Sequence, residues 1–160
     1  MRRLSIDQSY NFCAYIVWND GEVEQFGVIS SKHLEADVFG RARYVAECIL
    51  DVCDKNDINN INIEGLAFGA TGNVARDLAG LLFTIINIVT YKRPATKFEL
   101  FPPTSVKKIA VGTSKGVDKK QMIAALPHDI RQQFELAGFK KTTGLSDLAD
   151  AYWIGCCTPV

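Results

Sequence analysis

The sequence predicts an α/β protein whose mixed five-stranded sheet, with three antiparallel strands followed by parallel ones, is flanked by helices. Three strand-like segments come first and are joined by short polar turns, an arrangement typical of antiparallel pairing. Helix-like and strand-like segments then alternate, which favours parallel strands joined by helical crossovers. The sequence contains neither a Gly-x-Gly-x-x-Gly motif nor a Walker phosphate loop, so we expect no nucleotide cofactor and no doubly wound fold.

The first 29 residues should form the antiparallel part of the sheet. Residues 2–8 and 11–18 are rich in Ile, Val, Tyr and Phe, which favour strands. Asn19-Asp20-Gly21 is a hairpin signal, because Asp and Gly tolerate the positive φ that such turns need. A third strand is expected near 22–29.

Two amphipathic helices should alternate with two short strands in the middle of the chain. Apolar residues recur at helical spacing over 36–53 and 73–91. Short apolar runs at 60–64 and 97–101 are typical of inner strands, and Pro102-Pro103 stops the second of them.

The last third of the chain should be helical. Thr104 is a candidate cap for a short helix at 105–110. Ser146 is the candidate N-cap of the final helix, which should run to about Cys156. Two further helices are expected at 118–126 and 128–138.

Length and composition indicate one soluble domain spanning residues 1–160. The longest apolar stretch, Leu78 to Val89, is too short to cross a bilayer, and the N-terminus lacks the apolar core of a signal peptide. We therefore expect a cytoplasmic protein without a membrane partner. The five cysteines include no Cys-x-x-Cys pair, so we expect reduced thiols that fill the core.

The net charge is zero, which alone argues against DNA binding, but the charges are unevenly distributed. From Asp20 to Glu64 ten acids oppose four bases, a net charge of −6. From Lys92 to Lys120 eight bases oppose two acids, a net charge of +6. The basic stretch predicts a phosphate-binding face. A solvated surface helix and loop would explain the same charges equally well.

Four carboxylates occupy positions from which they could converge. Asp7 ends the first strand and Glu64 ends the fourth, so the two are neighbours if these strands pair. Asp147 and Asp150 are three residues apart in the last helix and project from one face. Clustered carboxylates repel one another unless cations lie between them, and hard oxygen ligands suit Mg²⁺ or Mn²⁺. Two such ions can activate a water and stabilise the leaving oxygen at a scissile phosphate.

Each acid also has an ordinary structural explanation. Asp7 could cap a turn with Ser9, and Glu64 could be a surface acid at a strand end. The helix dipole alone could explain Asp147. Asp150 is harder to explain in this way, because it lies among apolar residues.

Three acidic segments resemble the motifs of RuvC-type Holliday junction resolvases, in the order and over the chain length of that family. They are Leu4-Ser5-Ile6-Asp7-Gln8-Ser9, Ile63-Glu64-Gly65 and Ser146-Asp147-Leu148-Ala149-Asp150-Ala151. The segments 106–112 and 118–122 are similar to the family's basic region. The Asp-x-x-Asp-Ala sequence is the most specific of these signals.

The resemblance implies an RNase H-like fold and a homodimer that makes two symmetric cuts in a four-way junction. It implies Mg²⁺-dependent hydrolysis of phosphodiester bonds, with two ions per active site and Mn²⁺ as a possible substitute. The implied metal ligands are Asp7, Glu64, Asp147 and Asp150. Lys107 and Lys119 match family lysines near the scissile phosphate, and Lys108, Lys115 and Lys120 complete the expected DNA-binding lysines.

Departures from the usual bacterial pattern favour a divergent bacteriophage member, acting in the host cell cytoplasm. Gln8 stands where the family commonly has proline, and the loop after Glu64 is rich in glycine. Phe68 in that loop is a candidate aromatic wedge that stacks on a splayed base, or alternatively a core residue. In the family, the helix that corresponds to 73–91 contributes to the dimer contact. Gly80 in this helix would serve that contact or close packing on this chain's own sheet.

Three functional hypotheses follow. The first is a junction resolvase, which also acts on other branched DNA if it follows some bacteriophage members. The second is an RNase H-like nuclease that cuts RNA or an RNA–DNA hybrid. The third is a junction-binding protein without catalytic activity.

Overall fold

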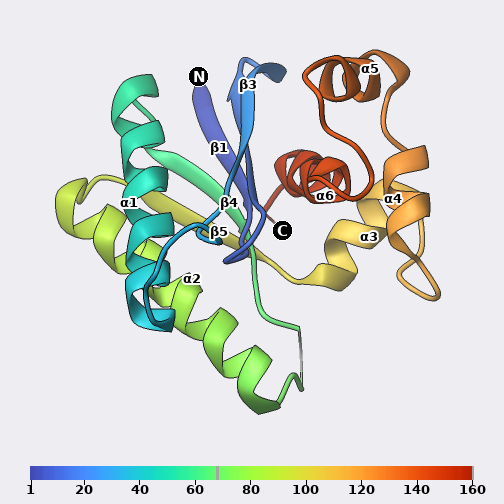
Figure 1. The fold of residues 1–160 in the computed structure, drawn as a ribbon. Coiled ribbons are helices and arrows are strands. Elements are labelled where there is room, and N and C mark those ends of the chain that lie inside the picture. Colours follow the sequence, from blue (N-terminus) through green and yellow to red (C-terminus); the bar gives the residue numbers. More distant parts are fainter. Residues whose placement is uncertain (68, 160) are drawn as a thin grey trace.

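A computed structural model describes residues 1–67 and 69–159, and its centre is a mixed five-stranded sheet with helices on both faces (Figure 1). The strand order is β3-β2-β1-β4-β5. The strands are β1 (Arg2–Asp7), β2 (Cys13–Asn19), β3 (Glu22–Ile29), β4 (Asn60–Glu64) and β5 (Lys97–Phe101). The helices are α1 (Val38–Asn56), α2 (Gly72–Lys92), α3 (Pro103–Val111), α4 (Lys119–Ala124), α5 (His128–Leu136) and α6 (Leu145–Cys156).

Strand pairing confirms the predicted class. β1, β2 and β3 pair antiparallel, whereas β1, β4 and β5 pair in parallel. The turn between β2 and β3 is the predicted one, with φ of 50° at Asp20 and 91° at Gly21. Positive φ at both central residues gives the backbone twist that a two-residue hairpin needs.

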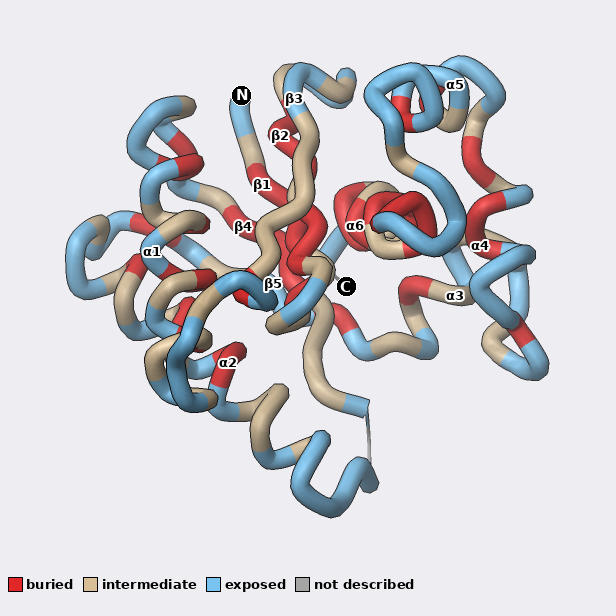
Figure 2. The backbone as a smooth tube through the Cα atoms, viewed as in Figure 1, coloured by how far each residue is buried: buried red, intermediate tan, exposed pale blue. Residues whose placement is uncertain are grey.

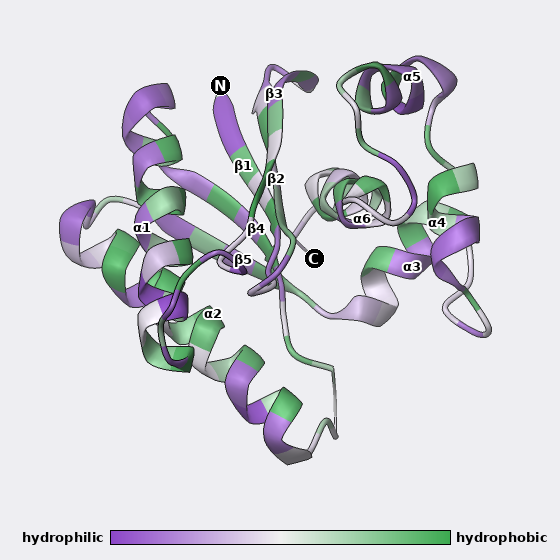
Figure 3. Ribbon diagram, viewed as in Figure 1, coloured by the Kyte–Doolittle hydropathy of each residue, from purple (hydrophilic) through white to green (hydrophobic). Residues whose placement is uncertain are grey.

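Different helices pack on the two faces of the sheet, with α1 and α2 on one face and α6 on the other (Figures 1 and 2). Successive side chains on a strand point to opposite faces. Leu4 and Ile6 of β1 therefore pack with α1 and α2, whereas Ser5 and Asp7 point toward α6. In Figure 3 α6 is mostly white and green and α5 largely purple, as expected for a buried and a surface helix.

α2 is longer than the apolar stretch that the sequence suggested. It has 21 residues, and its most apolar window has a mean hydropathy of 1.4, enough by length and composition to cross a membrane. The expectation that the longest apolar segment is too short to cross a bilayer was therefore wrong about its length. The helix packs against α1 and buries Leu81, Leu82, Ile85 and Val89.

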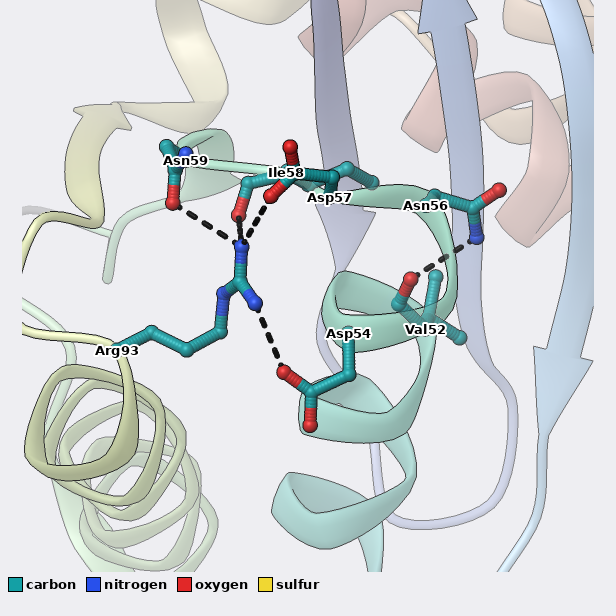
Figure 4. Close-up of polar contacts among 7 residues, drawn as sticks. All are labelled: Val52, Asp54, Asn56, Asp57, Ile58, Asn59 and Arg93. Carbon is teal, nitrogen blue, oxygen red and sulfur yellow. Dashed lines mark hydrogen bonds and ion pairs between the residues drawn. The ribbon is translucent and has the colours of Figure 1, made fainter.

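Arg93 fastens the end of α2 to the end of α1 (Figure 4). Its guanidinium donates to Asp54 at 2.8 Å and to Asp57 at 3.2 Å, and also to the Ile58 carbonyl at 3.1 Å. Nearby, the Asn56 side-chain amide donates to the Val52 carbonyl at 2.9 Å, within the last turn of α1.

Two predicted helix starts were wrong. Ser146 does not cap α6, which begins at Leu145 after Gly144 with φ of 107°. Ser146 is buried inside the helix, because Leu145 must enter the core to pack beside Leu148. Thr104 does not cap α3, because Pro103 begins that helix and its missing N–H costs nothing in a first turn.

Gly155 allows α6 to lie directly on β2. A Cβ at this position would lie 2.3 Å from Cζ2 of Trp18 and 2.5 Å from its Nε1. The indole is held in place, because its Nε1 donates to the Ser5 hydroxyl at 2.8 Å and Arg3 lies over the ring. A larger residue must therefore displace the helix.

We predict that Gly155→Ala lowers the free energy of unfolding by about 1–3 kcal/mol, because overpacking forces helix and sheet apart. Gly80→Ala is the matched control. Gly80 lies in the exposed face of α2, and a Cβ added there would meet no atom within 4 Å, so alanine should stabilise the protein by about 0.5–1 kcal/mol. Urea unfolding of both variants measures the difference, and equal changes would contradict the packing argument.

Candidate active site

The ends of β1 and β4 bring two carboxylates together. Asp7 is the last residue of β1 and Glu64 the last of β4. The strands pair in parallel, with Ile6 opposite Ile63, so both chains reach the same edge of the sheet at these acids. The condition on which Asp7 and Glu64 were expected to be neighbours, that β1 and β4 pair, is therefore met.

α6 brings the other two carboxylates to this edge. The helix packs across β1, β2 and β4, with Asp147 in its first turn and Asp150 one turn further. Burial raises the pKa of Asp7 well above its ordinary value, and repulsion from Asp150, Glu64 and Asp147 raises it further. All four acids therefore interact.

The other three carboxylates show the same effect. Burial, and then repulsion from Asp150, raises the pKa of Glu64 to about 7. Burial, and then repulsion from Asp147, raises the pKa of Asp150 to about 6. Burial also raises the pKa of Asp147. The environment thus disfavours the ionised form of every member of the cluster.

Two lysines partly offset this charge. Lys119 lowers the pKa of Asp7, Asp147 and Asp150, and Lys107 lowers that of Glu64 and Asp150. Lys119 is the first residue of α4, whose start is set by Asp118. The Asp118 carboxylate accepts from the Gln121 N–H at 2.8 Å, and the Asp118 N–H donates to the Gln121 side chain at 2.9 Å.

The remaining predicted DNA-binding lysines lie in the same part of the chain. Lys108 is on α3, Lys115 in the following loop and Lys120 on α4, and all three lie at the surface. Phe68, the predicted aromatic wedge, lies outside the described residues. A groove beside Glu64 is lined by the neighbouring loop, the start of α2 and Pro103.

Three ordinary explanations can be compared with the structure. Ser9 itself caps the turn after β1, where its hydroxyl accepts from the Asn11 and Phe12 N–H groups at 3.2 and 3.3 Å. The interpretation that Gly80 packs on this chain's own sheet was wrong, because that residue is exposed. The five cysteines are free thiols, as predicted.

Three polar residues next to the acids were not predicted from the sequence. The Gln8 side-chain amide donates to the Glu64 carbonyl at 3.2 Å and so links the ends of β1 and β4. Ser5 and Asn62 are buried on the α6 side of the sheet. A signal was available, because Ser5 and Asn62 are polar residues in otherwise apolar strands, each two positions before an acid.

The raised pKa values predict how the stability of the metal-free protein depends on pH. A carboxylate whose folded pKa is raised favours folding below its unfolded pKa, and this contribution is lost as the pH rises through the folded value. In EDTA we therefore expect Tm to fall as the pH rises from about 5 to about 8, by on the order of 5 °C. Differential scanning calorimetry measures the slope. Glu64→Gln should flatten it above pH 6, and an unchanged slope in that variant would contradict the assignment.

The arrangement of the acids falls short of a preformed chelate. Among residues 1–67 and 69–159, no three Asp, Glu, His or Cys side chains converge closely enough to hold an ion as they stand. Burial and mutual repulsion nevertheless raise the pKa of these acids, as expected for carboxylates gathered in one poorly solvated region. Carboxylates that repel one another spread apart when no cation lies between them.

Comparisons with known proteins identify the fold. No protein-family model matches the sequence, and no curated protein matches it either. Thermus thermophilus RuvC has a similar structure, with a TM-score of 0.69 and 13% identity over 98% of this chain and 93% of that one. The same protein in complex with a Holliday junction substrate gives a TM-score of 0.68, with 15% identity over 96% and 89% of the two chains.

A third similar structure comes from a different kind of organism. The yeast mitochondrial Holliday junction resolvase Ydc2 gives a TM-score of 0.67, with 14% identity over 96% of this chain and 75% of that one. These likenesses cover nearly the whole chain. They establish that the chain has the RuvC-like, RNase H-like fold that the acidic motifs predicted.

Proposed function

We propose that this protein is an endonuclease that resolves four-way DNA junctions by divalent-metal-dependent hydrolysis of phosphodiester bonds. The observation that carries this proposal is the cluster of four carboxylates at the shared edge of β1, β4 and α6, with Lys107 and Lys119 beside it. The likeness to two other proteins supports the same function, because RuvC is in complex with a Holliday junction substrate in one structure and Ydc2 is a Holliday junction resolvase.

The donor set fits a hard divalent cation. Asp7, Glu64, Asp147 and Asp150 offer only carboxylate oxygens, which suit Mg²⁺, with Mn²⁺ as a substitute. Positive charge between them would remove the repulsion that raises their pKa values. Two ions held there would activate a water and neutralise charge on the phosphate.

The lysines would act on the substrate. Lys107 and Lys119 would offset the negative charge that develops at the scissile phosphate. Lys108, Lys115 and Lys120, at the surface, would bind the DNA backbone and release counterions, without reading its sequence.

A homodimer is the assembly that suits a four-way junction, since two-fold symmetry places two equivalent sites on two equivalent strands. The exposed face of α2 supports such a contact. Phe83 is 57% exposed on this helix, and Phe39 of the neighbouring α1 is 76% exposed. Exposed large apolar side chains next to one another are typical of protein contacts.

Cleavage of a labelled synthetic four-way junction tests the proposal, with linear duplex, Y-fork and RNA–DNA hybrid as controls. We expect paired symmetric nicks with Mg²⁺ or Mn²⁺ and none with EDTA. Cuts in the hybrid or the fork but not in the junction would keep the metal site and overturn the substrate. Junction binding without cleavage in either metal would point to a non-catalytic junction-binding protein.

A further inference from the structure

Two buried polar residues lie side by side in the sheet beneath α6. Ser5 of β1 is fully buried and Asn62 of β4 is 7% exposed, and the two are register partners. Each lies two positions before an acid of the cluster, Asp7 or Glu64, so it points to the same face of the sheet. Burial of a polar side chain is costly unless it is hydrogen-bonded, so the bonds of these residues need an explanation.

Asn62 bonds to the end of α6. Its side-chain Nδ2 donates to the Ile154 carbonyl at 3.1 Å and to the Cys157 carbonyl at 3.2 Å. The Ile154 carbonyl also accepts from the Cys157 N–H at 3.2 Å, so Asn62 adds a second bond at the C-terminal end of α6 and ties that end to β4.

The bond lies close to an acid on each element. Asp150 precedes Ile154 by one helical turn, which is about 6 Å along the helix. Glu64 follows Asn62 by two strand residues, which is about 6.6 Å. The bond between Asn62 and Ile154 therefore joins α6 to β4 within about one turn of Asp150 and two residues of Glu64.

A second contact restrains α6 from the other side. Gly155 lies against Trp18, and the Trp18 indole donates to Ser5, the register partner of Asn62. The two contacts hold adjacent residues of the helix, Ile154 and Gly155, against β4 and β2. These two contacts therefore fix the C-terminal part of α6 relative to both β4 and β2.

We propose that Asn62 is a positioning residue for the active site, which holds α6 so that Asp147 and Asp150 face Asp7 and Glu64. This inference deepens the proposed function and rests on it. Asn62 touches neither the substrate nor the carboxylates in this role. It acts through the helix that carries two of them.

The chain offers a matched control for a merely structural role. Asn56 also donates from its side-chain amide to a helix carbonyl, that of Val52 at 2.9 Å, but it lies at the end of α1 on the opposite face of the sheet (Figure 4). Asn56→Ala and Asn62→Ala should each lower Tm. Only the second should misplace the acids.

The test compares both variants with the wild type in three measurements. Asn62→Ala should lower the single-turnover rate of junction cleavage at saturating protein by about 10- to 100-fold, because a misplacement of about 1 Å is sufficient for such a loss. Its Kd for the junction in EDTA should stay within about twofold of wild type, since the lysines are untouched. Calorimetric titration with Mn²⁺ alone should show affinity weaker by about 10-fold or more. Asn56→Ala should match wild type in all three.

Several outcomes would overturn the role of Asn62. A normal cleavage rate and normal Mn²⁺ affinity in Asn62→Ala would do so, and so would equal losses in Asn56→Ala. If Asn62→Ala does not fold, Asn62→Ser replaces it, because its hydroxyl can still donate one bond, and an intermediate loss is expected. If the wild type cuts no junction, the proposed function fails, while the Mn²⁺ titration still decides whether Asn62 positions the acids.

Discussion

Asp7→Asn should abolish junction cleavage and at the same time raise the Tm of the metal-free protein. Asp7 lies at the centre of the cluster, where its ionised form is disfavoured by burial and by three other acids. Asparagine has the same shape without the charge, so it relieves this repulsion. The same change removes an oxygen ligand from the proposed metal site. Loss of a residue that only hydrogen-bonds to a metal ligand already lowers metal affinity or activity by about 10- to 100-fold. We therefore expect Asp7→Asn to lower the cleavage rate by more than about 100-fold.

Cleavage of the four-way junction in Mg²⁺ and thermal unfolding in EDTA measure the two effects. Asp51→Asn is the matched control, because Asp51 is an exposed acid on α1. Among the described residues, its salt-bridge partner is Lys55. It should cut like wild type. Wild-type activity in Asp7→Asn would reject the assigned site, and a lower Tm in EDTA would contradict the electrostatic argument.

Lys119→Gln should slow cleavage at saturating protein by on the order of 100- to 1000-fold, the cost of removing one group that stabilises charge in a transition state. Lys119 is the lysine that lowers the pKa of three of the four acids. Its loss should also destabilise the protein slightly in EDTA, because the acids then repel one another without compensation. The rate should fall more than the affinity for the junction, since other exposed lysines remain.

Single-turnover kinetics and a binding titration separate these two effects. Lys55→Gln is the control, because Lys55 pairs with Asp51 on the exposed face of α1 and should affect neither quantity. If Lys119→Gln weakened binding and left the saturated rate unchanged, Lys119 would be a backbone contact like its neighbours. A change of neither quantity would remove it from the site.

The proposed site combines four acids whose pKa values are raised with a helix that is held by contacts beneath it. We expect the raised pKa values to lower the stability of the metal-free protein. The contacts beneath α6, from Asn62 to Ile154 and from Gly155 to Trp18, hold the helix in place in spite of that repulsion. Strain at a functional site persists only where the surrounding structure restrains it, and these contacts are the restraint.

The sequence by itself determined the elements, their order and the identity of the candidate acids. Local patterns were sufficient for these features, because the period of apolar residues and the φ that Asp20 and Gly21 can adopt depend on a few neighbouring residues. The charge imbalance also placed the basic segment that became α3 and α4. Each acid was weak evidence alone, and their joint positions together with the resemblance in their order predicted a common site.

Only the tertiary structure decided which of these residues meet. Asn62 bonds to a carbonyl 92 residues away, and no local pattern encodes that distance. The start of α6 was mispredicted at Ser146 because local capping preference competes there with burial of Leu145. The pairing of β1 with β4 and the close approach of Gly155 to Trp18 likewise depend on which faces bury one another. Such contacts are chosen by packing over the whole core, and a local pattern carries no information about its distant partner.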